Sequence, residues 1–192
     1  MKYSVFNKGI FMNSVSINIP SSGSKGITGN FFVYVVEKVM TEKKPFKIEQ
    51  VNDNFYRSNN ITEKELQLLQ VKGIKKIVNL KTMKKEKLEN LQKVAAKYGI
   101  EIENISINQF NIKKTIGRII EVLKDSKVKV VHCEFGIDRT GFVTALERYI
   151  IENRSMPDAI KEMKAHGFKG LRNIIFGNFL IYLKKFAKQN PL

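Results

Sequence analysis

From about residue 46 onward, apolar and polar residues follow patterns that predict strands and helices in turn. Short runs of β-branched and aliphatic residues between turn signals predict strands, and apolar residues three and four positions apart predict helices. The strands are expected at residues 47–51, 55–57, 74–80, 100–107 and 128–131. The helices are expected at residues 62–72, 84–98, 112–124, 141–153, 157–166 and 171–188. This alternation predicts an α/β fold with a central, mostly parallel sheet of about four to five strands flanked by helices.

Local signals support several of these boundaries. Thr62 and Glu65 have the spacing of a capping box, in which the threonine and the glutamate each bond the other's backbone at the start of a helix. Gly73 and Gly99 follow two expected helices, where glycine commonly ends a helix. An Asn-Asp-Asn turn at residues 52–54 is expected to join the first two strands.

Residues 1–45 differ in composition from the rest of the chain. Serine, glycine and asparagine gather at residues 21–30, and a short apolar segment follows before Pro45. We expect an N-terminal extension over residues 1–45 that is at best partly ordered, and one globular domain over residues 46–192.

The segment from His132 to Gly141 carries the most specific chemical signal. It follows an expected strand, and its last residues begin an expected helix. Backbone N–H groups of such a loop can point at one anion, and the helix N-terminus adds its unpaired donors and positive dipole end. The same field favours the thiolate form of Cys133 over the thiol. Arg139, six positions later, has a planar fork of donors that can grip two phosphate oxygens.

His-Cys, five residues and then Arg-Thr-Gly resembles the signature loop of the cysteine-dependent protein tyrosine phosphatase superfamily, in particular its compact bacterial dual-specificity branch. Residues 54–58 resemble the strand that opens many compact bacterial members. Residues 73–80 resemble their next strand, although Lys81 stands where arginine is usual. Residues 159–168 resemble their A-x-x-E-M-x-x-x-G-F helix. The resemblance therefore extends over residues 46–188 in one consistent order.

The resemblance implies a two-step hydrolysis of phosphate monoesters through a phosphocysteine intermediate. Cys133 would attack phosphorus, and Arg139 would clamp the substrate and the transition state. Thr140 would hydrogen-bond the sulfur and help it leave, while His132 would orient the loop and support the thiolate. The loop amides would hold the equatorial phosphate oxygens. These phosphate-binding amides belong to Glu134, Phe135, Gly136, Ile137, Asp138 and Arg139.

No cofactor is implied by this chemistry, and no metal is expected. One cysteine and two widely separated histidines cannot form a conventional zinc site.

The general acid is not at its usual position. Dual-specificity enzymes protonate the leaving oxygen with an aspartate on the loop after the preceding strand, but residues 106–111 contain no carboxylate. Of the four aspartates, three are expected in turns or at a helix start: Asp53, Asp125 and Asp158. The Gly-x-Asp-Arg-Thr arrangement also resembles the loop of myotubularin-like and some bacterial lipid and tyrosine phosphatases, which implies an acid within the loop. We therefore predict that Asp138 is the proton donor; a salt bridge or hydrogen bond that braces the loop is the alternative.

The charge of the chain indicates the kind of partner. There are 34 basic and 18 acidic side chains, which give a formal net charge of +16. Such a charge attracts anionic partners, although a solvated lysine coat would give the same composition. The lysines are dispersed and do not alternate with aromatic residues, so nucleic acid is not an expected partner. We expect a monomer that acts on a phosphorylated anionic substrate, either a phosphopeptide or an inositol phosphate.

The single cysteine rules out an intramolecular disulfide and is typical of a reducing compartment. The longest apolar run near the N-terminus, Phe31 to Val36, is far shorter than the roughly 20 residues that a membrane span requires. We therefore expect no transmembrane segment and a cytoplasmic protein. Delivery into a host cell by a route without a conventional signal is left open.

Four functions remain at this point. The first is a dual-specificity or tyrosine-type protein phosphatase. An inositol-phosphate or phosphoinositide phosphatase is favoured by the Asp-Arg-Thr loop and the basic charge, but Glu134 and the lack of a lysine in the loop speak against it. A non-catalytic phosphate-binding module is disfavoured because Cys133 and Arg139 are both present. An RNA 5′-phosphatase is the most distant alternative.

Overall fold

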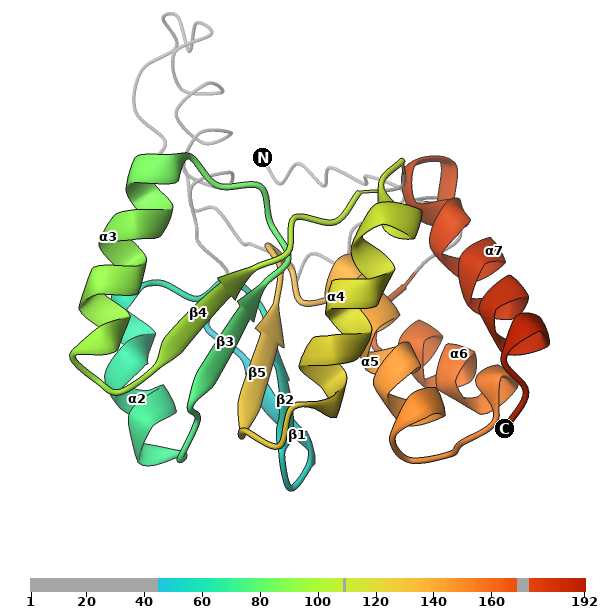
Figure 1. Cartoon of the computed structure of the whole chain (residues 1–192), viewed down its shortest axis with the longest axis horizontal. Helices are drawn as coiled ribbons and strands as arrows, with labels where there is room; N and C mark the ends of the chain where they lie inside the picture. Colours follow the sequence, from blue (N-terminus) through green and yellow to red (C-terminus); the bar gives the residue numbers. More distant parts are fainter. Residues whose placement is uncertain (1–44, 109, 169–172) are drawn as a thin grey trace, which may run out of the picture. The chain divides into compact units, whose positions relative to one another are not determined.

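A computed structural model of the chain describes residues 45–108, 110–168 and 173–192 (Figure 1). Apart from Pro45, the extension expected at residues 1–45 lies outside the described residues.

The centre of the fold is a five-stranded sheet with the strand order β1-β2-β5-β3-β4. Neighbouring strands are parallel except β1 and β2, which form an antiparallel hairpin at one edge. The expected fold class, a mostly parallel sheet of four to five strands flanked by helices, is therefore confirmed. The strands are β1 (Ile48–Asn52), β2 (Phe55–Ser58), β3 (Lys76–Asn79), β4 (Glu101–Asn104) and β5 (Lys129–His132).

Helices cover both faces of this sheet. One face carries α2 and α3, and the other carries α4 to α7 (Figure 1). The helices are α2 (Leu66–Val71), α3 (Lys85–Ala96), α4 (Ile112–Lys124), α5 (Asp138–Ile150), α6 (Met156–Ala165) and α7 (Asn173–Gln189), and a short 3₁₀ turn, η1 (Glu63–Glu65), precedes α2.

Side-chain alternation along the strands divides the apolar core into two layers. In β5, Val130 packs with the α2/α3 side, whereas Val131 packs with the α4–α7 side. In β3, Ile77 and Val78 divide in the same way. Successive strand residues point to opposite faces, so a strand covered by helices on both sides needs a continuous apolar run. This requirement explains the two adjacent β-branched residues at the centre of β3 and of β5.

The capping box is present where it is expected. The backbone N–H of Thr62 donates to Glu65 Oε2 at 2.7 Å, and the Thr62 side chain in turn accepts the backbone N–H of Glu65. The first turn is a 3₁₀ turn, and the α-helix starts only at Leu66.

Two of the boundaries that differ from the sequence expectation lie near the signature loop. The strand expected at residues 100–107 ends at Asn104, although the N–H groups of Ile105 and Ile107 still bond to Asn79 and Leu80. The helix expected at residues 141–153 starts earlier, at Asp138, because the signature loop runs directly into its first turn. Asp138 suits that place, since a carboxylate is stabilised at a helix N-terminus.

Helix α5, which follows the loop, is fixed by contacts with α6 and α7. Phe142 stacks on Phe179 of α7 with ring centroids 4.7 Å apart, and both side chains are fully buried. Arg148 forms a two-pronged ion pair with Glu162 of α6, with Nε–Oε2 at 3.0 Å. Aromatic packing and the ion pair together fix the helix whose first turn belongs to the loop.

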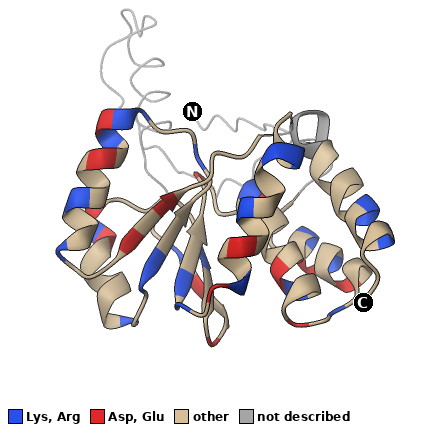
Figure 2. Cartoon of the chain, viewed as in Figure 1, with Lys and Arg blue, Asp and Glu red and all other residues tan. Residues whose placement is uncertain are grey.

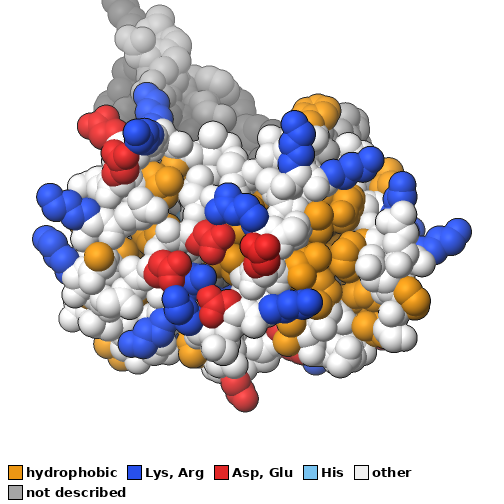
Figure 3. Space-filling model, in the orientation of Figure 1, with side chains coloured by type: hydrophobic (Ala, Val, Ile, Leu, Met, Phe, Trp, Pro, Cys, Tyr) orange, Lys and Arg blue, Asp and Glu red, His pale blue; other side chains and the backbone are white. Residues whose placement is uncertain are grey.

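Charged residues are spread over the surface. Lysine and arginine occur on most helices, as Figure 2 shows. On the face drawn in Figure 3, acidic side chains gather in the middle and basic ones lie scattered around them. In the described part of the chain, no helix has the length and apolar character to cross a membrane.

A buried ion-pair network lies where the strands begin. Lys76 Nζ is 2.7 Å from Asp125 Oδ2, 3.5 Å from Glu103 Oε2 and 3.6 Å from Glu101 Oε1. The Lys76 side chain is only 8% exposed. Its hydrogen bond holds the pKa of Asp125 below the ordinary value of 3.8, and the backbone N–H of Lys127 acts in the same direction. A lowered carboxyl pKa stabilises the fold above the ordinary pKa, and this contribution is lost as the pH falls below it.

We expect Asp125→Asn to lower the free energy of unfolding at pH 7 by about 1–3 kcal/mol, because Lys76 loses a charged hydrogen-bond partner. The loss should shrink at pH 3, where the wild-type carboxyl also takes up its proton. Urea unfolding at both pH values measures the difference. Asp53→Asn, in the exposed β1–β2 turn, is the matched control and should change little. An equal loss at both pH values would contradict the role given to the Asp125 charge.

Candidate active site

The signature loop begins at the end of the central strand. His132 is the last residue of β5, and its strand partners are Ser58 at the end of β2 and Asn79 at the end of β3. Cys133 therefore lies at the carboxyl edge of the sheet, between the segments that follow β2 and β3. Open α/β sheets bind their ligands at this edge.

Gly136 gives the loop its shape. Its φ is +68°, which side-chain-bearing residues rarely adopt. A Cβ at this position would lie 2.8 Å from the carbonyl oxygen of Ser58 and 3.0 Å from the backbone nitrogen of Asn59. The loop therefore lies directly against the end of β2, and only glycine fits there.

Hydrogen bonds from the β2 side hold the loop in place. Arg57 Nη2 donates to the carbonyl of Gly136 at 2.9 Å. The backbone N–H of Asn60 donates to the carbonyl of Glu134 at 3.3 Å. These two bonds direct the carbonyls of Glu134 and Gly136 toward the β2 side, an arrangement compatible with loop N–H groups that bind an anion.

Lys81 anchors the loop from the β3 side. Its ammonium lies 3.2 Å from Glu134 Oε2 and also donates to the side-chain oxygen of Asn60. Lys81, which stands where arginine is usual, thus pairs with Glu134, the residue directly after Cys133. This pairing offsets the negative charge that Glu134 brings to the rim of the site.

Arg139 lies in the first turn of α5 and reaches toward the end of β3. Its Nη1 donates to the carbonyl of Leu80 at 3.2 Å, and the residue is half-buried. One edge of the guanidinium is therefore oriented by the backbone, which is compatible with the phosphate-clamping role predicted for this side chain.

Cys133 is the only cysteine of the chain and is a free thiol. It is 3% exposed, so the sulfur lies at the base of the loop and not on the surface. Burial at the end of a strand excludes water from the sulfur, and a water-poor site strengthens the fields of nearby charges and dipoles.

His132 is completely buried. Its Nδ1 accepts a hydrogen bond from the backbone N–H of Ile61 at 3.3 Å, which ties the base of the loop to the segment after β2. Burial, aided by the positive charges of Lys81 and Arg139, lowers the pKa of His132 to about 3. The ring is therefore neutral near pH 7, so it can orient the loop but brings no positive charge to a thiolate.

Thr140 is fully buried in the first turn of α5. Its carbonyl accepts a hydrogen bond from Thr144 Oγ1 at 2.9 Å. The Thr140 hydroxyl has no hydrogen-bond partner among the described residues, so the bond to the Cys133 sulfur that the resemblance implies is not formed in this structure. Its expected role in the release of the sulfur stays a prediction.

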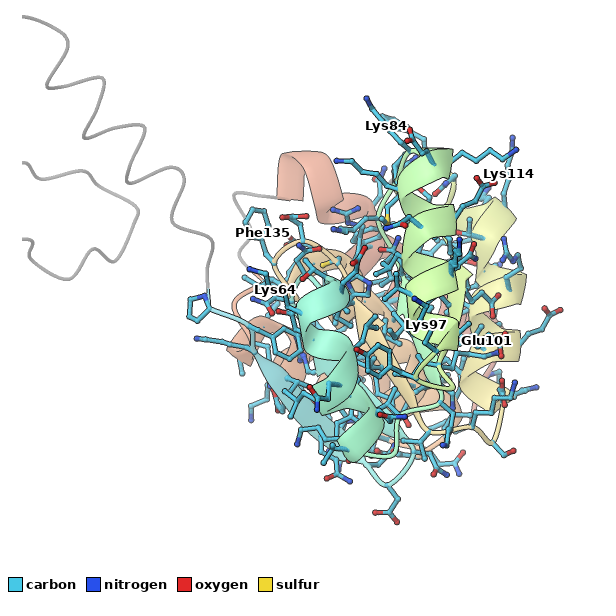
Figure 4. All side chains as sticks on the ribbon, turned by 90° about the vertical axis from the view of Figure 1, so that its left-hand side faces the viewer. Lys64, Lys84, Lys97, Glu101, Lys114 and Phe135 are labelled. Atoms are coloured by element: carbon cyan, nitrogen blue, oxygen red, sulfur yellow. The ribbon has the colours of Figure 1, made fainter. Side chains whose placement is uncertain are left out.

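The remaining loop residues differ in exposure. Phe135 is 49% exposed, and Figure 4 shows it at the surface in the upper part of the molecule, where Lys84 also lies. Ile137 is partly buried and packs against the core, in contact with Gly167. Asp138 is 5% exposed at the N-terminus of α5. Its carboxyl therefore lies inside the loop region and not on the open surface.

Residues 106–111 stand where the resemblance places the acid loop, and asparagine side-chain amides bond the backbone of the same segment. Asn111 Nδ2 donates to the carbonyl of Ser106 at 2.8 Å, and Asn108 Oδ1 accepts the N–H of Phe110 at 2.8 Å. These amides shape a turn before α4. They occupy the place of an acidic residue without supplying a titratable proton.

The other aspartates lie where the sequence places them. Asp53 is in the β1–β2 turn, and Asp158 is in the first turn of α6, 2.5 Å from Ser155 Oγ. Asp125 precedes β5 and bonds Lys76 at the start of β3, at the edge of the sheet opposite to Cys133. Asp138 is the only aspartate of the loop.

The sequence reasoning gave no role to Arg57, Asn60 or Lys81, which all contact the loop. Arg57 had a detectable signal, because a charged residue in a buried strand needs a specific partner. Asn60 had no such signal, since an asparagine after a strand is usually only a turn residue.

The family comparison covers the sheet, the loop and α5. A family model described as "Tc-R-P: Polymorphic toxin system, DSP-PTPase phosphatase" matches residues 52–153, more than half of the 192 residues. No curated protein sequence matches the chain.

Solved structures share the fold at low sequence identity. TpbA of P. aeruginosa is 17% identical with a TM-score of 0.57, and the match covers 72% of this chain and 83% of that one. Tk-PTP in its active form is 16% identical with a TM-score of 0.55, covering 74% and 97%. PTPMT1 is 14% identical with a TM-score of 0.52, covering 75% and 100%. The fold and the matched family together confirm the resemblance: the chain belongs to the DSP-PTPase phosphatases of polymorphic toxin systems and is a cysteine-dependent phosphatase.

Proposed function

We propose that this phosphatase hydrolyses phosphotyrosine in proteins, with Cys133 as the nucleophile and Arg139 as the phosphate clamp. The observation that carries the proposal is the loop itself, which starts at the end of the central strand, is pinned to β2 at Gly136 and runs directly into α5. We expect the loop amides, the N-terminus of α5 and the Arg139 guanidinium to bind one phosphate group there.

The first step forms a sulfur–phosphorus bond. The Cys133 thiolate attacks phosphorus, the ester P–O bond breaks, and the leaving oxygen takes a proton from Asp138. In the second step water attacks phosphorus and passes a proton to the Asp138 carboxylate, while the S–P bond breaks. Inorganic phosphate leaves, and both the thiolate and the acid are restored.

The substrate class follows from the leaving group. A tyrosine phenol has a pKa of about 10, so its oxygen leaves with less help from an acid than the alkyl oxygen of serine or threonine does. The loop at residues 106–111 carries no carboxylate, which favours the aryl ester. TpbA, which shares the fold, has been solved as a cysteine-to-serine variant in complex with phosphotyrosine. The acidic rim residue Glu134 disfavours highly charged inositol phosphates.

The family name also supports a place of action. The matched family model describes a phosphatase of polymorphic toxin systems. This supports action after delivery into another cell, which the sequence left open.

We expect Cys133→Ser to lower the hydrolysis of para-nitrophenyl phosphate and of a phosphotyrosine peptide by about 10³-fold or more, because the nucleophile is lost. A phosphoserine peptide and inositol hexakisphosphate complete the substrate panel, with the phosphotyrosine peptide expected to have the highest wild-type kcat/KM. Wild-type protein that binds phosphate but hydrolyses no member of the panel would instead indicate a binding module.

Arg139→Lys should lower kcat/KM for para-nitrophenyl phosphate by about 10²-fold, because lysine keeps the charge but loses the planar fork. Arg118→Lys is the matched control, since Arg118 is an exposed arginine of α4 that pairs with Glu103 at 3.2 Å. Steady-state kinetics should give wild-type values for the control. Equal effects of the two substitutions would remove Arg139 from the phosphate site.

Asp138→Asn should slow the hydrolysis of alkyl phosphates by about 10²–10⁴-fold and that of activated aryl phosphates far less, because only the former need a proton on the leaving oxygen. The matched control is Asp158→Asn, which removes another carboxylate from the first turn of a helix. Rates on both substrate types are compared. A uniform loss on both would show that Asp138 braces the loop and is not the acid.

A further inference from the structure

Arg57 is an unusual residue for the middle of a sheet. It belongs to β2, faces Val131 of the central strand in the register, and is only 4% exposed. Its strand neighbours Phe55 and Tyr56 are apolar core residues. Burial of a guanidinium is strongly unfavourable unless specific partners compensate for the lost water.

The partner that the structure shows is the catalytic loop. Arg57 Nη2 donates to the carbonyl of Gly136 at 2.9 Å, across 79 positions of the chain. Nη1 of the same guanidinium is buried and has no hydrogen-bond partner among the described residues. The bond reaches the residue whose positive φ turns the loop, directly beside the contact of Gly136 with Ser58.

The acidic groups around Arg57 are engaged elsewhere. Glu49 of β1 lies 3.1 Å from His166 Nε2, and Glu162 of α6 is gripped by Arg148 of α5. Neither glutamate is within ion-pair distance of Arg57 in the described structure. Burial lowers the pKa of Arg57, while Glu49, Glu162 and the Cys133 sulfur oppose this and Arg148 adds to it. An arginine remains charged under these conditions, so a permanent positive charge lies behind the loop.

We propose that Arg57 is a positioning residue of the active site: it holds the left-handed turn at Gly136 and places a fixed positive charge that favours the thiolate form of Cys133. This inference rests on the proposed nucleophilic role of Cys133. Arg139 is the proposed phosphate clamp, whereas the buried Arg57 would act through its bond to the loop backbone. Because His132 is neutral, the positive side chains at the loop are Arg57, which bonds the Gly136 carbonyl, Lys81, which pairs with Glu134, and Arg139 in the first turn of α5.

Two substitutions separate the charge from the hydrogen bond. Arg57→Gln keeps a donor for the Gly136 carbonyl but removes the charge, while Arg57→Lys keeps the charge but loses the planar donor group. The readout is the rate of alkylation of Cys133 by iodoacetamide between pH 5 and 10. Since Cys133 is the only cysteine, every alkylated sulfur reports on this position.

For Arg57→Gln we expect the pH of half-maximal alkylation to rise by about one unit, because the thiolate loses a nearby opposite charge. For Arg57→Lys we expect a smaller rise, together with a higher KM for para-nitrophenyl phosphate because the loop is held less firmly. The matched control is Lys129→Met. Lys129 is a buried cation at the start of β5, at the other end of the sheet, and bonds the Asp125 carbonyl at 2.6 Å. Its loss should lower the melting temperature but leave the alkylation profile unchanged.

A purely structural Arg57 gives a different result. Both Arg57 variants would then melt at lower temperature but show the wild-type alkylation profile and the wild-type KM, and this outcome overturns the proposal. If the Arg57→Gln variant does not fold, the test rests on the Arg57→Lys variant. An unchanged alkylation profile together with an unchanged KM in Arg57→Lys would likewise overturn the proposal. Failure of the proposed function is recognised separately: wild-type Cys133 would then resist iodoacetamide over the whole pH range.

Discussion

The contact between Gly136 and the end of β2 is the constraint on which the site depends. At 2.8 Å from the Ser58 oxygen there is no room for a Cβ, and the left-handed turn at this glycine directs its carbonyl toward Arg57. The neighbouring carbonyl of Glu134 is bound by Asn60 in the same manner. A loop whose carbonyls are bonded by surrounding residues can keep its N–H groups free to bind an anion. Its donors are then preorganised before the anion binds.

The histidine of the site and its basic side chains have different parts. His132, which stands next to the nucleophile, is kept neutral by its burial. Positive charge comes from two arginines and from Lys81, which also compensates the acidic rim residue Glu134. His132 is thus tied to the backbone of Ile61, and the positive charge near the loop belongs to the arginines and the lysine.

The sequence allowed the fold to be predicted well because each element has a local signal. β3 and β5 each have two adjacent β-branched residues at their centre, and the helix expected at residues 112–124 has these bounds in the structure. The contacts that support the loop could not be predicted, because they join residues far apart in the chain, such as Arg57 and Gly136. The early start of α5 was missed for a related reason: the loop is shaped by β2, not by its own propensities.

The solitary cysteine has a consequence for oxidation. A reactive thiolate is a target for peroxide, and many redox-sensitive enzymes protect the resulting sulfenic acid by forming a disulfide with a second cysteine nearby. This chain has no other thiol, so an oxidised sulfur at position 133 cannot be rescued from within. Recovery then depends on small thiols that enter the loop or on ring closure with a backbone nitrogen. Further oxidation to the sulfinic or sulfonic acid would inactivate the enzyme irreversibly.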